Sequence, residues 1–252
     1  MKLTILERPT SLTEKDFQAR LGKELELLKG ELNASITMDG FSNSGWTQLH
    51  VTGEDSEITA ELISKKFSLA HTTPHEIELP GNYPAQIVGS NERGLKLDLG
   101  FGTKSSECLI PTSNLNTQLA DGKNLPLRQL VECYCLYPGV RVAIRVDRKT
   151  GYAVQGWLSD DFLDTLADWV TTGLDRILVF ECFKREAESA ALKAHLSRDV
   201  IAIDSVTLTI QSIVCKLGTD AVGLIPQLGR ILRKQPLKPF QPNKITSRCR
   251  PW

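Results

Sequence analysis

The chain has 252 residues, of which 41% are hydrophobic and 24% charged, a composition typical of a folded protein with a sizeable core. Its 30 basic and 30 acidic side chains balance, which excludes a strongly basic or strongly acidic protein. No apolar run follows a basic start, and no stretch approaches the roughly twenty apolar residues that span a bilayer. We therefore expect a cytoplasmic protein that does not enter a membrane.

Charge is distributed unevenly along the chain. Residues 1–79 and residues 159–228 each have a net charge of −5, whereas residues 80–158 have a net charge of +3. Residues 229–252 contain seven basic side chains and no acidic one. Positive charge confined to two places favours a polyanionic partner, with an unevenly charged but merely solvated surface as the alternative.

Residues 1–79 predict a small α+β module. A strand at 2–7 precedes a helix that begins at the capping-box pair Ser11 and Glu14, and strands follow at 34–38 and 46–52. Ser56 caps a second helix, and a strand at 75–79 is expected to close the sheet. The order β-α-β-β-α is typical of a ferredoxin-like split βαβ domain. Residues 71–84 then form a linker.

Residues 80–158 predict a closed five-stranded barrel. Leu95, Leu97 and Leu99 alternate with polar residues, which is the pattern of a half-buried strand. The apolar side chains at 140, 142, 144 and 146 alternate in the same way, so we expect them inside the barrel. Five short strands, with a partly helical excursion before the fourth, fit an OB-fold.

Three motifs of this segment have the order found in a known family. They are Leu97-Asp-Leu-Gly100, Leu109-Ile-Pro111 and Pro138-Gly-Val-Arg-Val142. Their order resembles the RNA-binding OB domain that is repeated in ribosomal protein S-one. The resemblance covers about a third of the chain, and it implies an OB-fold that binds RNA. The aromatic pair usual in that family is replaced here by Asn91-Glu-Arg-Gly-Leu95.

Residues 159–233 predict a further α+β module. A helix that begins at Ser159 is followed by a strand at 176–182, a helix at 185–196 and strands at 200–203 and 208–216. From residue 221 the apolar spacing suits a helix, but Gly223, Pro226 and Gly229 oppose one.

Two internal repeats compete for this region. The element order parallels that of residues 2–68, which predicts a second ferredoxin-like module. Alternatively, residues 213–233 repeat the barrel motif of residues 97–111. We favour the first because it accounts for more of the chain. The segments 199–204 and 215–226 also resemble an archaeal family catalogued as a conserved domain of unknown function, and this resemblance implies no activity.

The sequence contains no motif that indicates catalysis, so we expect a non-enzymatic protein without a cofactor. The loop 100–105 lacks the spacing of a nucleotide-hydrolysing phosphate loop. As a barrel loop it offers Phe101 for base stacking and Lys104 as a cation. The six cysteines include no CxxC pair, and Cys133 and Cys135 have the wrong spacing for zinc. We therefore expect neither a metal site nor a disulfide.

Residues 234–252 form a basic, proline-rich tail. Its four prolines preclude a long helix and favour an extended arm that follows an RNA groove or an acidic surface. A disordered tail that only improves solubility is the alternative.

Together these features predict a non-enzymatic RNA-binding protein of the translation or transcription machinery, associated with the ribosome or with RNA polymerase. A protein-interaction adaptor, whose acidic α+β modules dock basic subunits, is the alternative. The residues expected to contact RNA are basic or aromatic and come from the barrel and the C-terminal region: Arg93, Lys96, Phe101, Lys104, Arg141, Arg145, Arg230, Arg233, Lys234 and Lys238.

Overall fold

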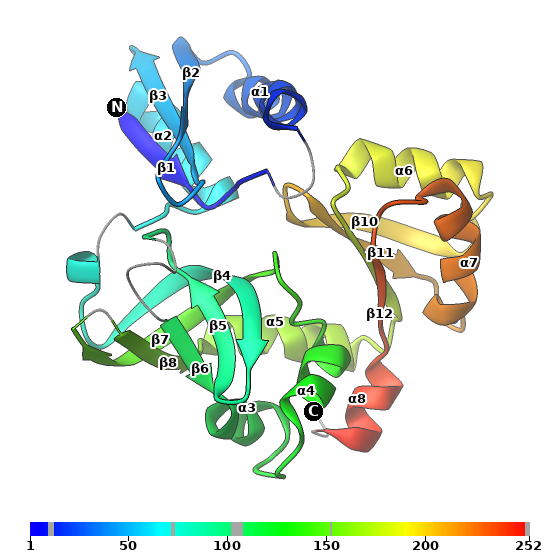
Figure 1. The fold of residues 1–252 in the computed structure, drawn as a ribbon. Helices are drawn as coiled ribbons and strands as arrows, with labels where there is room; N and C mark the ends of the chain where they lie inside the picture. Colours follow the sequence, from blue (N-terminus) through cyan, green and yellow to red (C-terminus); the bar gives the residue numbers. More distant parts are fainter. Residues whose placement is uncertain (10–12, 72–73, 102–107, 152, 250–252) are drawn as a thin grey trace.

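The computed structural model describes the chain except for residues 10–12, 72–73, 102–107, 152 and 250–252. It is an α+β fold that consists of a closed β-barrel and two further sheets, each with its own helices (Figure 1). We call these parts the first module, the barrel and the third module, in chain order.

The first module is a three-stranded antiparallel sheet with two helices on one face. Its elements are β1 (Lys2–Ile5), α1 (Glu14–Lys29), β2 (Ala34–Phe41), β3 (Thr47–Gly53) and α2 (Ser56–Phe67). The strands lie in the order β1-β3-β2. Ser11 lies outside the described residues, and α1 is capped instead by Thr13, whose hydroxyl accepts a hydrogen bond from the N–H of Asp16.

The predicted closing strand at 75–79 is wrong, because residues Pro74–Glu76 form the 3-10 helix η1. The sheet is extended by a single bridge between Leu69 and Ile5 directly after α2. The N–H of His71 then donates to the carbonyl of Leu99 at 2.9 Å. The chain therefore leaves the first sheet and contacts the barrel within two residues, which leaves no room for a longer fourth strand.

The central segment forms the predicted closed barrel of five strands. These are β4 (Gly81–Asn91), β5 (Gly94–Asp98), β6 (Cys108–Pro111), β7 (Arg141–Thr150) and β8 (Ala153–Leu158). They close in the order β4-β5-β6-β8-β7, with β6 and β8 parallel, which is an OB-fold barrel. Helices α3 (Thr112–Leu119) and α4 (Leu127–Tyr134) separate β6 from β7. The predicted inner residues are confirmed, since Leu95, Leu97, Leu99, Val140, Val142, Ile144 and Val146 are all buried.

The third module follows α5 (Asp160–Thr171) and is a four-stranded antiparallel sheet. Its elements are β9 (Arg176–Phe180), α6 (Lys184–Lys193), β10 (Val200–Thr207), β11 (Ile210–Cys215), α7 (Ala221–Ile231) and β12 (Leu237–Phe240), followed by α8 (Pro242–Arg248). The strand order is β10-β11-β9-β12. The repeated element order is present, because β9, β10 and β11 have the same relative order as β1, β2 and β3. The alternative is wrong, because residues 213–233 form the end of β11 and the helix α7.

The expectation of a free C-terminal arm is also wrong over residues 237–248. Strand β12 pairs with β9, and Pro239 is tolerated there because β12 is an edge strand. Phe240 is fully buried, and its ring packs edge-on against Trp169 with 5.3 Å between the centroids. The tail therefore completes the sheet of the third module and fixes it to α5.

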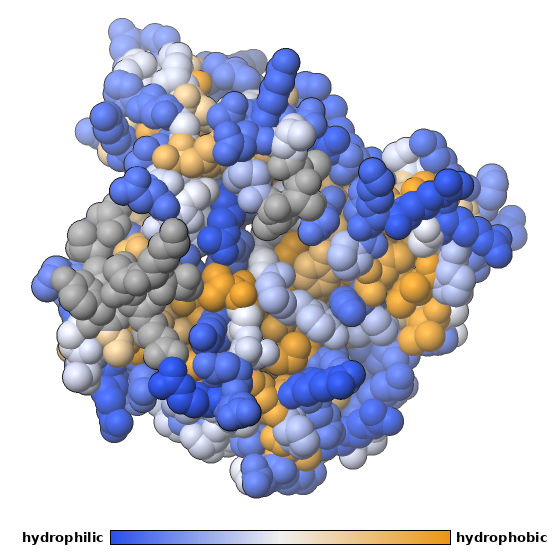
Figure 2. Space-filling model, in the orientation of Figure 1, coloured by the Kyte–Doolittle hydropathy of each residue, from blue (hydrophilic) through white to orange (hydrophobic). Residues whose placement is uncertain are grey.

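The barrel and the third module share one apolar core. Alternate residues of a strand face opposite sides of a sheet. Ile177 and Val179 accordingly pack under α6 and α7, whereas Leu178 and Phe180 belong to the core of the barrel. Apolar surface is visible along the boundary between these two parts (Figure 2).

Candidate nucleic-acid interface

The first module docks on the barrel through two adjacent residues of opposite charge. Asp98, Gln86 and Arg141 form a row across β5, β4 and β7, because Gln86 pairs in register with both of the others. Glu7 lies 2.5 Å from Arg141 Nη2, and Arg8 lies 3.7 Å from Asp98. The two ion pairs therefore hold the two ends of one row.

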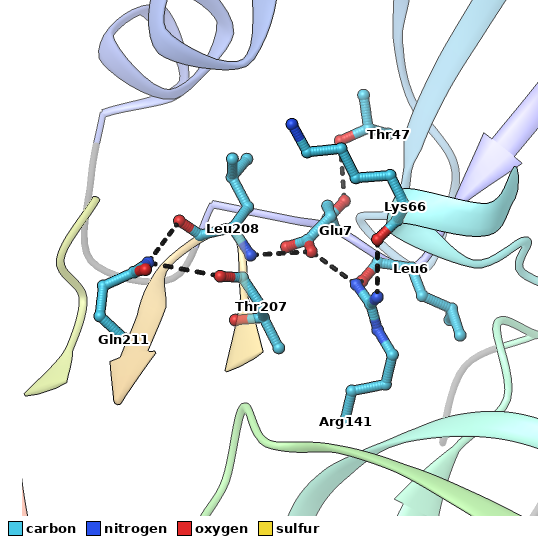
Figure 3. A network of polar contacts seen from close by, with 8 residues as sticks. All are labelled: Leu6, Glu7, Thr47, Lys66, Arg141, Thr207, Leu208 and Gln211. Carbon is cyan, nitrogen blue, oxygen red and sulfur yellow. Dashed lines mark hydrogen bonds and ion pairs between the residues drawn. The ribbon is translucent and has the colours of Figure 1, made fainter. Parts of the chain in front are cut away.

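Glu7 connects all three parts of the molecule (Figure 3). Besides its contact with Arg141 of the barrel, its carboxylate accepts a hydrogen bond from the N–H of Leu208 in the third module at 3.1 Å. Its own carbonyl accepts one from the hydroxyl of Thr47 at 2.7 Å. Burial raises the pKa of Glu7, and Arg141 and the Leu208 N–H offset part of that rise. This network is a structural junction.

The junction removes Arg141 from the surface that was expected to contact phosphate. Its guanidinium also points at the carbonyl oxygens of Leu6 and Lys66, each at 3.4 Å, and its side chain is only 15% exposed. Arg145 remains exposed and lies 3.9 Å from Asp160. Of the two β7 arginines expected to contact RNA, only Arg145 is therefore left exposed.

The remaining barrel residues do not form one face either. Arg93 is exposed in the turn between β4 and β5, and Lys96 is half-buried on β5. Arg145 is on β7, with β4 between it and Lys96, so the two side chains point in different directions around the barrel. Phe101 is buried in the barrel core rather than available for stacking, and Lys104 lies outside the described residues. Arg93 and Lys96 thus share one hairpin, β4–β5.

The C-terminal cations lie together in sequence but on different surfaces. Arg230, Arg233 and Lys234 are exposed at the end of α7 and in the turn that follows. Lys238 is half-buried on β12, and its ammonium lies 5.0 Å from the centroid of the Tyr137 ring. None of these four side chains pairs with an acid in the part of the chain that the structure describes.

Sequence reasoning missed two residues that the fold brings to this region. Arg8 comes from the first module, and its guanidinium stacks 4.3 Å from the ring centroid of Trp46 beside Asp98. Gln86 is 5% exposed on the outer side of β4. Neither position has a local sequence signal, because both acquire their surroundings only when the three parts assemble.

The described residues provide no group of three His, Cys, Asp or Glu side chains that could hold a metal ion. The six cysteines are free thiols, and burial raises the pKa of both Cys135 and Cys182 to about 12. Within the same described ranges, every helix is too short or too polar to cross a membrane.

Residues 174–237 match the family model described as the DUF2110 C-terminal domain. The expected resemblance to a family of unknown function is thereby confirmed over the third module. No protein of the curated set matches the chain.

Two solved structures match parts of the chain at low identity. The solution structure of GSP13 from Bacillus subtilis has 14% identity and a TM-score of 0.26, over 33% of this chain and 56% of that one. The chain thus spans about half the length of GSP13. The crystal structure of the intact alpha subunit of aIF2 from Pyrococcus abyssi has 10% identity and a TM-score of 0.26, over 68% of this chain and 99% of that one.

Proposed function

We propose that this protein binds single-stranded RNA without catalysing a reaction, and that it does so through its C-terminal cations and the β4–β5 hairpin. The observation that carries this proposal is the run of cations from residue 230 to residue 248. It contains no acid, and none of its Lys or Arg side chains forms an ion pair with a described residue. In the first module, by contrast, five of the eight Lys and Arg side chains are ion-paired with described acids, and only Lys2, Lys15 and Lys23 are not.

Unpaired cations favour a polyanion because binding then releases counterions without first breaking an internal ion pair. Arg233 and Lys234 are exposed and adjacent, and Arg93 and Lys96 supply further charge on the OB-fold barrel. OB-folds bind single strands by combining a positively charged groove with contacts to the bases. The acidic first module would repel the same ligand, which confines it to these surfaces.

We further infer that both α+β sheets are ferredoxin-like. The third module has the complete β-α-β-β-α-β order, and its fourth strand is β12. The first module has the same order with its fourth strand reduced to the Leu69 bridge. An RNA-binding barrel between two such modules suits a component of the translation or transcription machinery, bound to the ribosome or to RNA polymerase.

The test is the salt dependence of binding to a mixed-sequence single-stranded RNA. A variant in which Arg230, Arg233, Lys234 and Lys244 are replaced by Gln should flatten the slope of log affinity against log salt by about 2 to 3 units. Replacing Arg93 and Lys96 by Gln should flatten it by about one unit. The matched control replaces four exposed cations elsewhere, Lys15, Lys23, Lys184 and Lys216, and should leave the slope unchanged.

Equal slopes for the C-terminal variant and the control would contradict the assigned surface. Failure of the unmodified protein to bind RNA at low salt would refute the proposal. That result would move the interpretation to the adaptor, in which the acidic modules dock basic proteins.

A further inference from the structure

A cavity of about 350 Å³ lies between the barrel and the third module. Its barrel side consists of β4 near Gln86 and the turn at 137–139. Its other side consists of the end of β9, the β10–β11 turn and the start of β12, and Arg8 of the first module also lines it. The volume is at the lower end of the roughly 300–1,000 Å³ found for small-molecule sites. The cavity therefore has room for one small ligand.

Two buried polar side chains on the wall of this cavity have no hydrogen-bond partner among the described residues. Gln86 is 5% exposed and Thr209 is 7% exposed. The side chains of both make no hydrogen bond to any residue that the structure describes. Gln86 is on the outer side of β4, opposite the barrel core, because its neighbours Ala85 and Ile87 are fully buried inside. Both side chains line the cavity, where a ligand can supply the hydrogen bonds that no described protein group makes.

Aromatic rings and charges complete the cavity. Tyr137 and Phe180 meet edge to face with 5.9 Å between their centroids. Lys238 and Arg8 supply two cations, and Glu181 supplies one carboxylate. Glu181 has a φ of 57°, in the left-handed region that non-glycine residues adopt rarely.

We propose that this cavity binds one ribonucleotide. The base packs against Tyr137 and Phe180 and bonds to Gln86 and Thr209, while the phosphate lies near Lys238 and Arg8. The Glu181 carboxylate accepts a hydrogen bond from a ribose hydroxyl, as acidic residues do in dinucleotide sites. The nucleotide is either a free mononucleotide or one unstacked residue of an RNA chain. Only the second case rests on the proposed function.

The probes are the four ribonucleoside 5′-monophosphates, their 2′-deoxy counterparts and the single-stranded RNA used above. The full chain is titrated with each of them by calorimetry or by fluorescence. Gln86→Leu should lower affinity about tenfold, because one buried hydrogen bond to the ligand is lost. Its melting temperature should stay the same or rise, because the amide has no protein partner to lose. A purely structural Gln86 would instead lower the melting temperature.

Lys238→Met should also lower affinity, and Lys216→Met, at an exposed position outside both the cavity and the C-terminal cations, is its matched control. If both cavity variants weaken mononucleotide binding, the cavity is supported as a nucleotide site. That holds even if RNA does not bind, in which case only the proposed function fails. If both variants weaken RNA binding, the cavity is supported as the site of one nucleotide of an RNA chain. If the two cavity variants bind both ligands as tightly as the unmodified protein does, the inference is overturned. RNA binding that is unchanged in these variants would still leave the proposed function standing. Equal affinity for ribose and deoxyribose forms would overturn the role of Glu181.

Discussion

Removing Arg141 should destabilise the junction of the three parts strongly and in a pH-dependent way. The side chains of Glu7 and Arg141 are 2% and 15% exposed, so the pair is shielded from water. Breaking a buried pair by removing one partner leaves an uncompensated charge, at a cost of about 3–5 kcal/mol. Arg141→Met keeps the aliphatic length and removes the charge. We therefore expect a loss in the free energy of unfolding in this range at pH 8.

The loss should be smaller at low pH. Burial already raises the pKa of Glu7, and Arg141 is the main influence that lowers it. Without Arg141 the folded-state pKa rises further above the unfolded value. The folded state then binds more protons than the unfolded state above pH 4.5, the ordinary value for Glu, so stability falls as pH rises through the folded-state pKa. Below pH 4.5 Glu7 is protonated in both states, and Arg141→Met loses the least there.

Urea unfolding at pH 5 and at pH 8 measures both effects. The double variant Glu7→Gln with Arg141→Met should recover at least half of the loss at pH 8, because no charge is then left buried. Arg145→Met is the control, and its exposed side chain should change stability by no more than about 0.5 kcal/mol. A loss below about 1 kcal/mol at pH 8, or an equal loss at the two pH values, would refute the buried-charge argument.

Three further predictions concern the barrel and the thiols. Val142→Asp places a carboxylate at a position that is 1% exposed, so the free energy of unfolding should fall by several kcal/mol and the barrel should unfold. A melting curve tests this, and a melting temperature equal to that of the unmodified protein would contradict the inner position of Val142. Thiol titration in denaturant should find six free thiols. Alkylation of the native protein should begin at Cys133, the one cysteine that is partly exposed. Early labelling of Cys108 would contradict its burial. Gly100→Ala should destabilise far more than Gly122→Ala. Both glycines have positive φ, but only at Gly100 would a Cβ meet backbone, 2.6 Å from the nitrogen of His71. Equal losses of stability in the two variants would show that this close contact with the His71 backbone is unimportant.

The barrel was predictable because its signals are local. Alternation along β5 and β7 decides which side chains face inward, and the long insertion before β7 contains the expected helical segment. The repeated element order identified the third module in the same way. Helix α7 was ambiguous because Pro226 opposes it, but Asp220 caps its first turn by accepting hydrogen bonds from the N–H groups of Val222 and Gly223.

The site residues were harder to predict because their surroundings come from distant parts of the chain. Arg141 and Arg145 look equivalent in the alternating pattern of β7, and only the docking of Glu7 on one of them makes them different. Strand β12 has only four residues and contains a proline, so no period-two pattern identifies it. Its partner β9 begins at Arg176, about sixty residues earlier. Charge and composition placed cations in the tail, but they did not show that the tail completes a sheet.

The position of Arg8 couples the junction to the cavity. Because Glu7 and Arg8 are adjacent, the contact that fixes Glu7 against Arg141 also fixes where Arg8 enters the cavity, between Asp98 and Trp46. A ligand that uses Arg8 therefore binds only when the first module is docked. By thermodynamic linkage the same ligand stabilises that docking, so it acts on the first module without needing to touch its helices. The first module is then a part of the binding site through one residue, and it also contacts the third module through Arg20, which pairs with Glu186.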